Sequence, residues 1–484
     1  MTHHREFYTI FVVGDRIFPK FAAMKATNIL LFLLGTLIIP LYLTSCGQDR
    51  WPEYAEQTKT DRWIDDTMRL WYYWDKDIPK SNVLNYFSEP FTFFKSLLSK
   101  KDGNGGSPFS TIDSITTATS RSIAPTDYSY GLEFELKPVK NNDTAYYARV
   151  LYAAHNSPAS EASLKRGDWI MKMNNKLITR KNYARLYGDQ AMELTVGYYD
   201  TVNDTIMAYP NAYNISGARS IKDNPVFYYN TYIKGNKRIG YLVYNHFSFG
   251  PSDNESDVSY NTELLNASNY FASQQVNEFV LDLRYNNGGY ISCAQLLATI
   301  LAPASALGAE MGYLEFNNQI NPQTQSFYLD QNLISGGSNL NLSTLYILTT
   351  DETASASEML INCLKPYMTI KIIGETTVGK NVGSKTFINS ELQIAISPIV
   401  CKIYNTKGKS DYADGLTPDQ ILYESSNLAN FLPFGNENEL LLAKAIDLIT
   451  GSSTSSIQTT PHSLKTTSFV NSIARRADKA VRIK

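Results

Sequence analysis

The sequence predicts a multidomain protein of mixed α/β (α+β) class, and two observations carry this prediction. Residues 345–380 run as an apolar strand, a helix, a second strand and a loop, which is the order of an α/β unit. Residues 128–202 instead alternate apolar and polar side chains, as strands with one buried face do. The chain has 484 residues, of which 43% are hydrophobic, so it is long enough for several domains with a sizeable core.

Charge and cysteine content restrict the possible partners. The net charge is −2 and the sequence has no basic stripe, which argues against nucleic acid as a partner. The four cysteines, Cys46, Cys293, Cys363 and Cys401, form no CxxC pair, so neither a zinc site nor a redox motif is supported. Cys293 and Cys363 lie in apolar helical patterns, and we expect them to be buried.

The segment 1–46 has the features of an export signal. The apolar run Ile29–Leu43 is short for a membrane span, follows Lys25, and leads into the small residues Thr44–Gly47. We therefore expect a signal peptide, with a single anchor helix as the alternative. Because Met24 and Lys25 would make a normal start for such a signal, residues 1–23 are interpreted as an over-assigned N-terminal extension.

Residues 50–107 predict a small helical N-terminal domain. Asp61–Asp75 and Asn85–Lys100 both space their aromatic and aliphatic side chains roughly as a helix does. Aromatic stripes of this kind are more typical of a core than of a ligand site. The loop Lys101–Ser107 ends the domain.

Residues 125–205 predict a β-domain that resembles a PDZ domain. Strands are expected at the start of the region and at Ala148–Tyr152, with a helix and a turn within Asn156–Ile170. Five residues stand where a PDZ carboxylate-binding loop stands: Tyr130, Gly131, Leu132, Glu133 and Phe134. The resemblance implies that the C-terminus of a substrate binds as an added strand. A β-domain that only packs is the alternative.

Residues 225–450, which include the α/β unit at 345–380, predict an α/β core. Strands are expected at Asn236–Phe247, at Phe279–Gly289 and at Gln393–Ile403, and helices at Val258–Gln275, Ile291–Leu301 and Glu437–Ile449. Gly288 and Gly289 allow a sharp turn where the second of these strands ends. Residues 451–484 are rich in Ser and Thr and then basic, which predicts a flexible tail.

The stretch Asp351–Lys380 carries the candidate chemistry. Ser355 lies at the expected start of a helix, and Lys380 lies in the glycine-bounded loop that follows the next strand. A serine hydroxyl needs a base to take its proton, and a lysine serves once desolvation lowers its pKa from about 10.4. The amides at a helix N-terminus can bind the developing oxyanion. The alternative is a capping box formed by Ser355 and Glu358, with a surface lysine.

The run Ser355-Ala356-Ser357-Glu358 and the loop GETTVGK resemble the C-terminal processing peptidases, which are Ser-Lys serine peptidases also called tail-specific proteases. The resemblance covers residues 50–450 and implies a core like that of the Clp-protease and crotonase group. It makes Ser355 the nucleophile and Lys380 the general base. Pro366 stands where some members have an Asp on this helix, which leaves Glu358 as the acidic residue that orients the lysine.

The same resemblance completes the expected site and its function. It makes the Ala356 amide one oxyanion donor and the Gly288 amide the second, with Gly289 as the near alternative. Asp282 and Arg284, just before these glycines, are expected to hold the loop in place. The resemblance implies hydrolysis of peptide bonds near accessible C-termini of proteins or peptides, through an acyl-enzyme and without a metal or cofactor. A non-catalytic peptide-binding scaffold and a hydrolase of non-protein acyl groups are the alternatives.

The residues before Cys46 resemble a bacterial lipobox. This resemblance implies cleavage before Cys46 and attachment of lipid to its sulfur. We therefore expect a protein of the bacterial cell envelope that is held at a membrane by its lipid, either in the periplasm or at the outer membrane or cell surface.

Overall fold

The computed structural model describes residues 51–104, 107–115, 128–251, 256–424, 427–452, 469–476 and 481–482. The expected signal segment and Cys46 lie outside these residues. No helix in the described ranges combines the length and the apolar character needed to cross a membrane.

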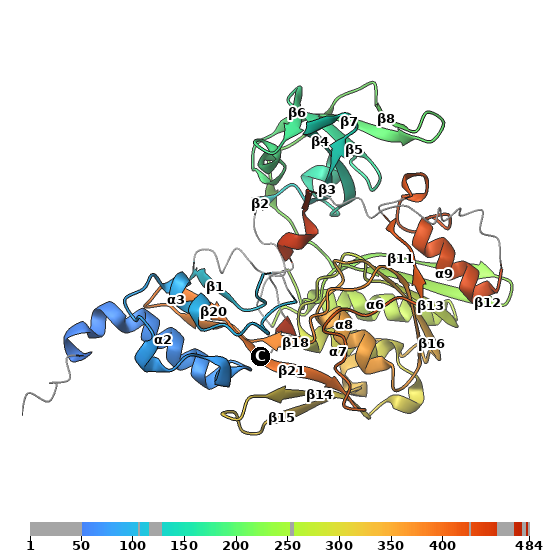
Figure 1. The fold of residues 1–484 in the computed structure, drawn as a ribbon. Helices are drawn as coiled ribbons and strands as arrows, with labels where there is room; N and C mark the ends of the chain where they lie inside the picture. The colour runs from blue at the N-terminus through green and yellow to red at the C-terminus, as the bar shows by residue number, and fades with distance from the viewer. Residues whose placement is uncertain are drawn as a thin grey trace, which may run out of the picture. The chain divides into compact units, whose positions relative to one another are not determined.

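Six strands between residues 226 and 421 form one mostly parallel sheet (Figure 1). Its strands, in spatial order, are β11 (Val226–Lys234), β12 (Lys237–Tyr244), β13 (Glu278–Asp282), β16 (Thr344–Thr349), β17 (Thr369–Gly374) and β22 (Gln420–Ile421). The first two strands pair antiparallel and all other neighbours pair parallel. The strands expected at Asn236–Phe247, at Phe279–Gly289 and at the start of residues 345–380 are present as β12, β13 and β16. The predicted mixed α/β class is confirmed.

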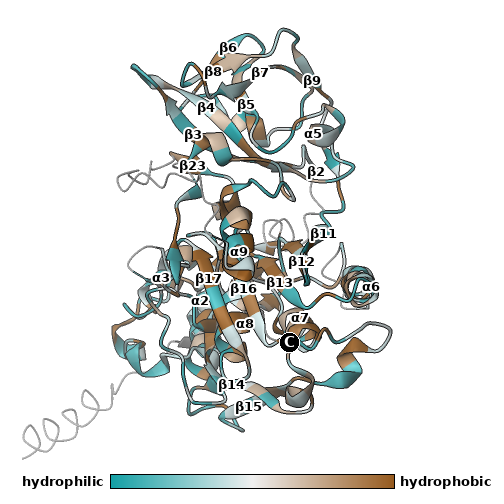
Figure 2. Ribbon diagram, turned by 90° about the vertical axis from the view of Figure 1, so that its right-hand side faces the viewer, coloured by the Kyte–Doolittle hydropathy of each residue, from teal (hydrophilic) through white to brown (hydrophobic). Residues whose placement is uncertain are grey.

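Helices cover both faces of this sheet. On one face lie α6 (Ser259–Ser273), α7 (Ile291–Leu301) and α8 (Ala356–Leu364), and on the other lies α9 (Leu440–Thr450) (Figure 1). Consecutive strand residues point to opposite faces, so Ile347 joins the first core cluster and Leu348 joins the second. Because helices cover both faces of the sheet, hydrophobic residues are frequent along β13, β16 and β17, as Figure 2 shows.

Two smaller sheets are separate from this six-stranded sheet. One has the order β15 (Thr324–Tyr328), β14 (Glu310–Phe316), β21 (Ile399–Asn405), β18 (Val382–Ser384) and β24 (Val481–Arg482), and the other has the order β1 (Thr111–Ser114), β20 (Ile394–Ser397) and β19 (Phe387–Asn389). The single strand predicted at Gln393–Ile403 is therefore wrong. Pro398 separates β20 from β21, because a proline has no N–H to donate to a sheet, and the two strands enter different sheets.

The N-terminal helices share their core with this second small sheet. They are α2 (Ala55–Trp71) and α3 (Pro90–Ser96), with the short 3-10 turns η1 (Trp51–Tyr54), η2 (Asp75–Asp77) and η3 (Ser81–Val83). Met68 and Phe93 pack in one cluster with Ile394 and Ile396 of β20. The predicted helices are present, but their apolar face is buried against strands that follow Lys380 in the sequence.

Residues 128–215 form most of an eight-stranded antiparallel sheet. Its strands are β3 (Leu132–Val139), β4 (Asn142–Ala153), β5 (Trp169–Met173), β6 (Lys176–Thr179), β7 (Met192–Asp200), β8 (Thr205–Ala208), β9 (Tyr213–Ile215) and β23 (Val470–Asn471). The short helix α5 (Pro158–Glu161) and the turn η5 (Tyr183–Tyr187) accompany it, and β2 (Tyr128–Ser129) pairs separately with β10 (Arg219–Ser220). The remaining short turns are η6 (Ala304–Ala306), η7 (Gln331–Ile334), η9 (Leu428–Asn430) and η10 (Ile473–Arg476).

Composition predicts a flexible tail at residues 451–484, but the described residues 469–476 and 481–482 differ from this prediction. The strand β23 pairs antiparallel with β3, and β24 pairs parallel with β18. Ile473, between them, is fully buried. Such very short strands leave no periodic signal in a sequence, so composition alone could not reveal that this segment is held by main-chain pairing.

Candidate active site

Ser355 occupies a strained turn between β16 and α8. Its backbone has φ +64° and ψ −115°, a region that costs a residue with a side chain about 1–3 kcal/mol and that is found mostly at functional sites. The side chain is fully buried. Its Oγ makes no hydrogen bond within the part of the chain that the structure describes. A strained serine with an unused hydroxyl is the arrangement expected of a nucleophile.

The carboxylate of Glu358 joins the serine turn to the lysine loop. Its Oε2 accepts hydrogen bonds from the backbone N–H of Ser355 at 2.7 Å and from the backbone N–H of Lys380 at 2.8 Å. Its Oε1 accepts from the N–H of Gly379 at 2.7 Å and from the hydroxyl of Thr377. The main chains of Ser355 and Lys380 therefore meet at one oxygen atom, although α8 and β17 lie between them in the sequence.

Burial controls the ionisation of Glu358. The side chain is fully buried, and desolvation raises the pKa of its carboxyl above the ordinary value. The hydrogen bonds from Thr377, Ser355, Gly379 and Lys380 favour the ionised form and oppose this rise. The carboxyl is thus stabilised by neutral donors that the active-site loops supply.

Lys380 is buried in front of an aromatic ring. Only 2% of the residue is exposed, and its Nζ lies 4.8 Å from the centroid of the Phe109 ring. This burial removes the amine from bulk water, which is the condition under which a lysine can act as a base. Sequence reasoning missed Phe109, because it lies in a distant part of the chain and no motif links it to the lysine.

The glycine turn after β13 lies against the nucleophile. Gly288 has φ +109°, and a Cβ at this position would lie 2.7 Å from the Cβ of Ser355. Gly289 has φ +140°, and a Cβ there would lie 2.1 Å from the carbonyl oxygen of Phe247. Neither position can carry a side chain, because both the left-handed backbone and the space exclude one.

The amides beside Ser355 are the candidate oxyanion donors. The Ala356 nitrogen would lie 3.0 Å from a Cβ at Gly288, so the start of α8 and the glycine turn face one another. The Gly288 N–H already donates to Oδ1 of Asn286 at 2.8 Å. This bond favours Gly289 over Gly288 as the second donor, and Asn286 is a further residue that sequence reasoning missed.

The hydroxyl of Thr377 ties the lysine loop to two other parts of the site. Sequence reasoning also missed this residue. Its hydroxyl donates to Glu358 and accepts from the N–H of Leu416 at 2.7 Å. Leu416 belongs to the turn Asp414–Asp419 that precedes β22. The signal was present in the sequence, because Thr377 lies inside GETTVGK, but a threonine in a short motif does not reveal its partners.

The residues predicted to form a carboxylate-binding loop lie at the start of β3, with Tyr130 and Gly131 just before the strand. Gly131 has φ +67°, and a Cβ there would lie 2.3 Å from the Cβ of Ser157. Leu132, Glu133 and Phe134 begin β3. Phe134 donates its N–H to the hydroxyl of Ser472, so the loop contacts the C-terminal segment.

A buried charge cluster lies next to the glycine turn. Arg284, which is fully buried, donates to Asp282 at 2.9 Å and to Glu439 at 2.7 Å, and it pairs with Glu424. Glu424 also pairs with Arg166, from the loop before β5. Burial alone would raise the pKa of Glu424, but the two guanidinium groups outweigh burial and lower it to about 2. The cluster links the loop after β13 to α9 and to the segment before β5, which agrees with the structural part expected of Arg284 and Asp282.

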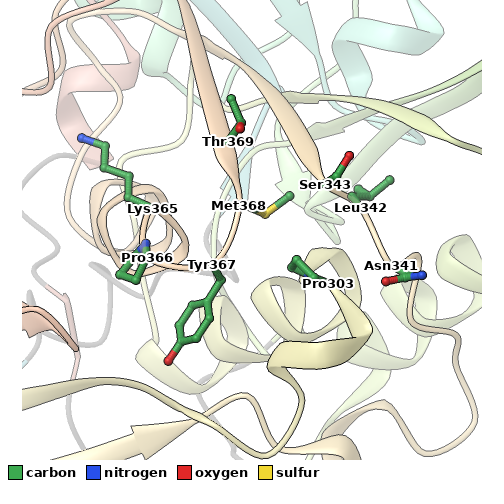
Figure 3. Close-up of a pocket in the computed structure, with 9 residues that line it drawn as sticks. All are labelled: Pro303, Asn341, Leu342, Ser343, Lys365, Pro366, Tyr367, Met368 and Thr369. Carbon is green, nitrogen blue, oxygen red and sulfur yellow. The ribbon is translucent and has the colours of Figure 1, made fainter.

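A hollow with a defined lining lies at the other end of α8. It has a volume of about 500 Å³ and is lined by residues that include Lys365, Pro366 and Thr369 (Figure 3). Ser355 is at the opposite end of this nine-residue helix, about 13 Å away at 1.5 Å per residue. Pro366 thus stands beside the hollow and takes no part in the network around Glu358.

Comparisons with known proteins identify the family of this chain. Residues 238–422 match the model of peptidase family S41, and residues 59–130 match the model of the peptidase S41 N-terminal domain. The carboxyl-terminal-processing proteases of Picosynechococcus and Synechocystis are 23% and 22% identical over 62% and 66% of this chain, and the matches span 66% and 68% of those proteins. The crystal structure of an S41 protease from Bacteroides fragilis is 40% identical, with a TM-score of 0.73, over 80% of this chain and 97% of that protein. The chain therefore belongs to peptidase family S41, a family of serine-type peptidases.

Proposed function

We propose that this protein cleaves peptide bonds of protein substrates with Ser355 as the nucleophile and Lys380 as the general base. One observation carries the proposal above the others. A single oxygen of Glu358 holds the backbone amides of both residues, at 2.7 and 2.8 Å, while Ser355 is kept in a strained turn with its hydroxyl unused. These hydrogen bonds thus hold close together the main chains of the two residues whose side chains the proposed chemistry requires.

The proposed reaction has two steps. The Oγ of Ser355 attacks the carbonyl carbon, and Lys380 takes the hydroxyl proton and passes it to the leaving amine as the C–N bond breaks. The Ala356 and Gly289 amides bind the oxyanion, and loss of one such donor costs roughly 10²–10³ in rate. Water then hydrolyses the acyl-enzyme with the same lysine as base.

We further propose that the substrates are extended segments near the C-termini of other proteins. Two relatives carry the name carboxyl-terminal-processing protease, and the resemblance of residues 125–205 to a PDZ domain supports binding of a substrate C-terminus as an added strand. The lipobox motif supports attachment of lipid at Cys46 and a place in the bacterial cell envelope.

The test is serine-dependent cleavage. The chain from Gly47 onward is incubated with an unstructured protein, and the fragments are identified by mass spectrometry. Ser355→Ala should abolish cleavage, and Lys380→Arg should do the same, because arginine stays protonated. Ser273→Ala, at an exposed position at the end of α6, is the matched control and should cleave normally.

Either of two results would contradict the proposal. Cleavage that survives Ser355→Ala would exclude this serine as the nucleophile. Absence of cleavage by the unmodified chain, with peptides still bound, would favour the peptide-binding scaffold instead.

A further inference from the structure

The C-terminal segment Phe469–Ile473, called here the tail strand, covers one edge of the eight-stranded sheet. The strand order places β23 outside β3, so β3 would be an edge strand without it. The Phe469 N–H donates to the Leu136 carbonyl at 3.1 Å, and the Ser472 N–H donates to the Phe134 carbonyl at 2.8 Å. An uncovered edge is a template for pairing with another extended chain, and the tail strand uses it in that way.

The first side chain of the tail strand, Phe469, is 38% exposed and packs its ring against two aromatic residues. The ring of Phe469 stacks on Tyr146, with centroids 5.1 Å apart, and meets Tyr183 edge to face at 5.8 Å. The guanidinium carbon of Arg180 lies 4.3 Å from the centroid of the same ring. Val470 packs against the apolar core of the sheet. These contacts select an aromatic residue followed by an aliphatic one.

The last two side chains of the tail strand, those of Ser472 and Ile473, also make specific contacts. The hydroxyl of Ser472 donates to the carboxylate of Glu133 and accepts from the Phe134 N–H at 2.8 Å. Ile473 is fully buried in a cluster with Leu151, Tyr152, Tyr285 and Phe431. These contacts select a small hydroxyl residue followed by an aliphatic one.

The tail strand also contacts the segment just before the candidate nucleophile. The Asn471 side-chain amide donates to Oε1 of Glu352 at 2.8 Å, and Glu352 lies shortly before Ser355 in the sequence. The Glu352 carbonyl in turn accepts from the side-chain amide of Asn287 at 2.9 Å, next to the glycine turn. Further along, β24 pairs with Gly383, shortly after the lysine loop. The polar residue of a chain bound on β3 in this direction would therefore lie beside the segment that precedes Ser355.

We propose that the tail strand is a built-in competitor at the edge of β3, where the resemblance to a PDZ domain already implies that a substrate strand binds, and that a substrate with the pattern aromatic–aliphatic–polar–hydroxyl–aliphatic must displace it. Main-chain hydrogen bonds give such an added strand its affinity, and the pockets for its side chains give specificity. Because the tail belongs to the same chain, it competes at an effective concentration of the order of millimolar. The proposal rests on the proposed peptidase function only for what happens after binding.

Peptide binding tests the proposal without requiring catalysis. The probe is a fluorescent peptide with the sequence of residues 469–476, and all chains carry Ser355→Ala. Binding is measured by fluorescence anisotropy to the chain from Gly47 to its end and to a chain that stops at Ser452. We expect the shortened chain to bind at least about tenfold more tightly, because the resident competitor is gone. Equal affinity for both chains, or no binding to the shortened one, would overturn the proposal.

Two further measurements keep the test decisive. In the full-length chain, Phe469→Ala should loosen the tail and raise the affinity for the probe, which does not depend on a truncated chain folding. In the peptide, replacement of the phenylalanine or of the serine by alanine should weaken binding to the shortened chain several-fold, while a scrambled peptide should not bind. A scrambled peptide that binds as well would show that the edge does not read this pattern.

The outcome separates this inference from the proposed function. If the probe binds as expected but neither the full-length chain nor the chain that stops at Ser452 cleaves protein when Ser355 is intact, the inference about the tail strand stands and the peptidase proposal fails. If the full-length chain cleaves proteins and the probe shows no preference for the shortened chain, the peptidase proposal stands and this inference fails.

Discussion

Glu358 and Glu424 are both buried carboxylates close to the loops of the candidate active site, yet their surroundings are opposite. Glu358 accepts from three backbone amides and one hydroxyl, and burial raises the pKa of its carboxyl. Glu424 faces the guanidinium groups of Arg166 and Arg284, which lower its pKa to about 2. The two carboxylates thus differ in whether neutral donors or cations compensate for their burial.

The difference separates a group that shapes the site from a group that holds the fold. Amides from Ser355, Gly379 and Lys380 converge on Glu358, so its position sets the position of the reacting residues. The partners of Glu424 come from different parts of the structure, and none of them is a proposed catalytic residue. Removing one partner of a buried ion pair is strongly destabilising, because it leaves an uncompensated charge.

The largest expected effect is on stability, from Glu424→Gln. This change leaves the buried Arg166 and Arg284 with less compensation, and it should lower the free energy of unfolding by about 3–5 kcal/mol. Urea unfolding followed by tryptophan fluorescence measures it. A loss below about 1 kcal/mol, far from the range for a broken buried pair, would show that the cluster does not hold the fold, and the contrast with Glu358 would disappear.

The contributions of the two carboxylates to the free energy of unfolding should change with pH in opposite directions. The pKa of Glu424 is lower in the folded protein than its usual 4.5, so its stabilisation is present above pH 4.5 and is lost as the pH falls toward 2. At about 1.36 kcal/mol per pKa unit, the stability advantage of the unmodified chain over Glu424→Gln should shrink by about 2 kcal/mol between pH 6 and pH 3.

Glu358 provides the control for that measurement. Its pKa is raised on folding, so its contribution to stability is largest at low pH and falls as the pH rises through the folded pKa. The advantage of the unmodified chain over Glu358→Gln should therefore grow on acidification. The same sign for both variants would contradict the assignment of neutral donors to one carboxylate and cations to the other.

The smallest expected effect on stability is that of Thr377→Val. Valine keeps the shape but removes the hydroxyl that donates to Glu358 and accepts from Leu416, at a cost of about 1–3 kcal/mol. Thr377→Ser keeps the hydroxyl and should retain most of the stability. Thermal unfolding of the two variants in parallel distinguishes them, and an equal loss in both would mean that the methyl group matters more than the hydrogen bonds.

Much of the fold could be predicted, because continuous apolar runs bounded by turn residues are local signals. The helix expected at Ile291–Leu301 is α7 residue for residue. The strand expected at Gln393–Ile403 failed at Pro398, where a single residue divides two sheets. The tail strand could not be predicted at all, because it is held as a strand only by pairing with the edge of β3, which lies far away in the sequence.

The candidate site shows the same division. Ser355, Glu358 and Lys380 could be proposed from two short motifs, since each motif is local in the sequence. Phe109, whose ring lies beside the lysine, could not, because nothing in residues 107–115 points to a partner after residue 350. The choice between Gly288 and Gly289 also needed the structure, since it depends on a hydrogen bond to Asn286.

The most direct test of the account is the cleavage rate of Glu358→Gln. Glutamine has one acceptor oxygen where the carboxylate has two, so some of the four donors lose their partner and the turns at Ser355 and Lys380 shift. A displacement of about 1 Å at a reacting group costs on the order of 10²-fold in rate, so we predict a loss of kcat of that size with KM little changed and the protein still folded. A folded Glu358→Gln protein that cleaves at the rate of the unmodified chain would contradict the claim that this carboxylate assembles the site.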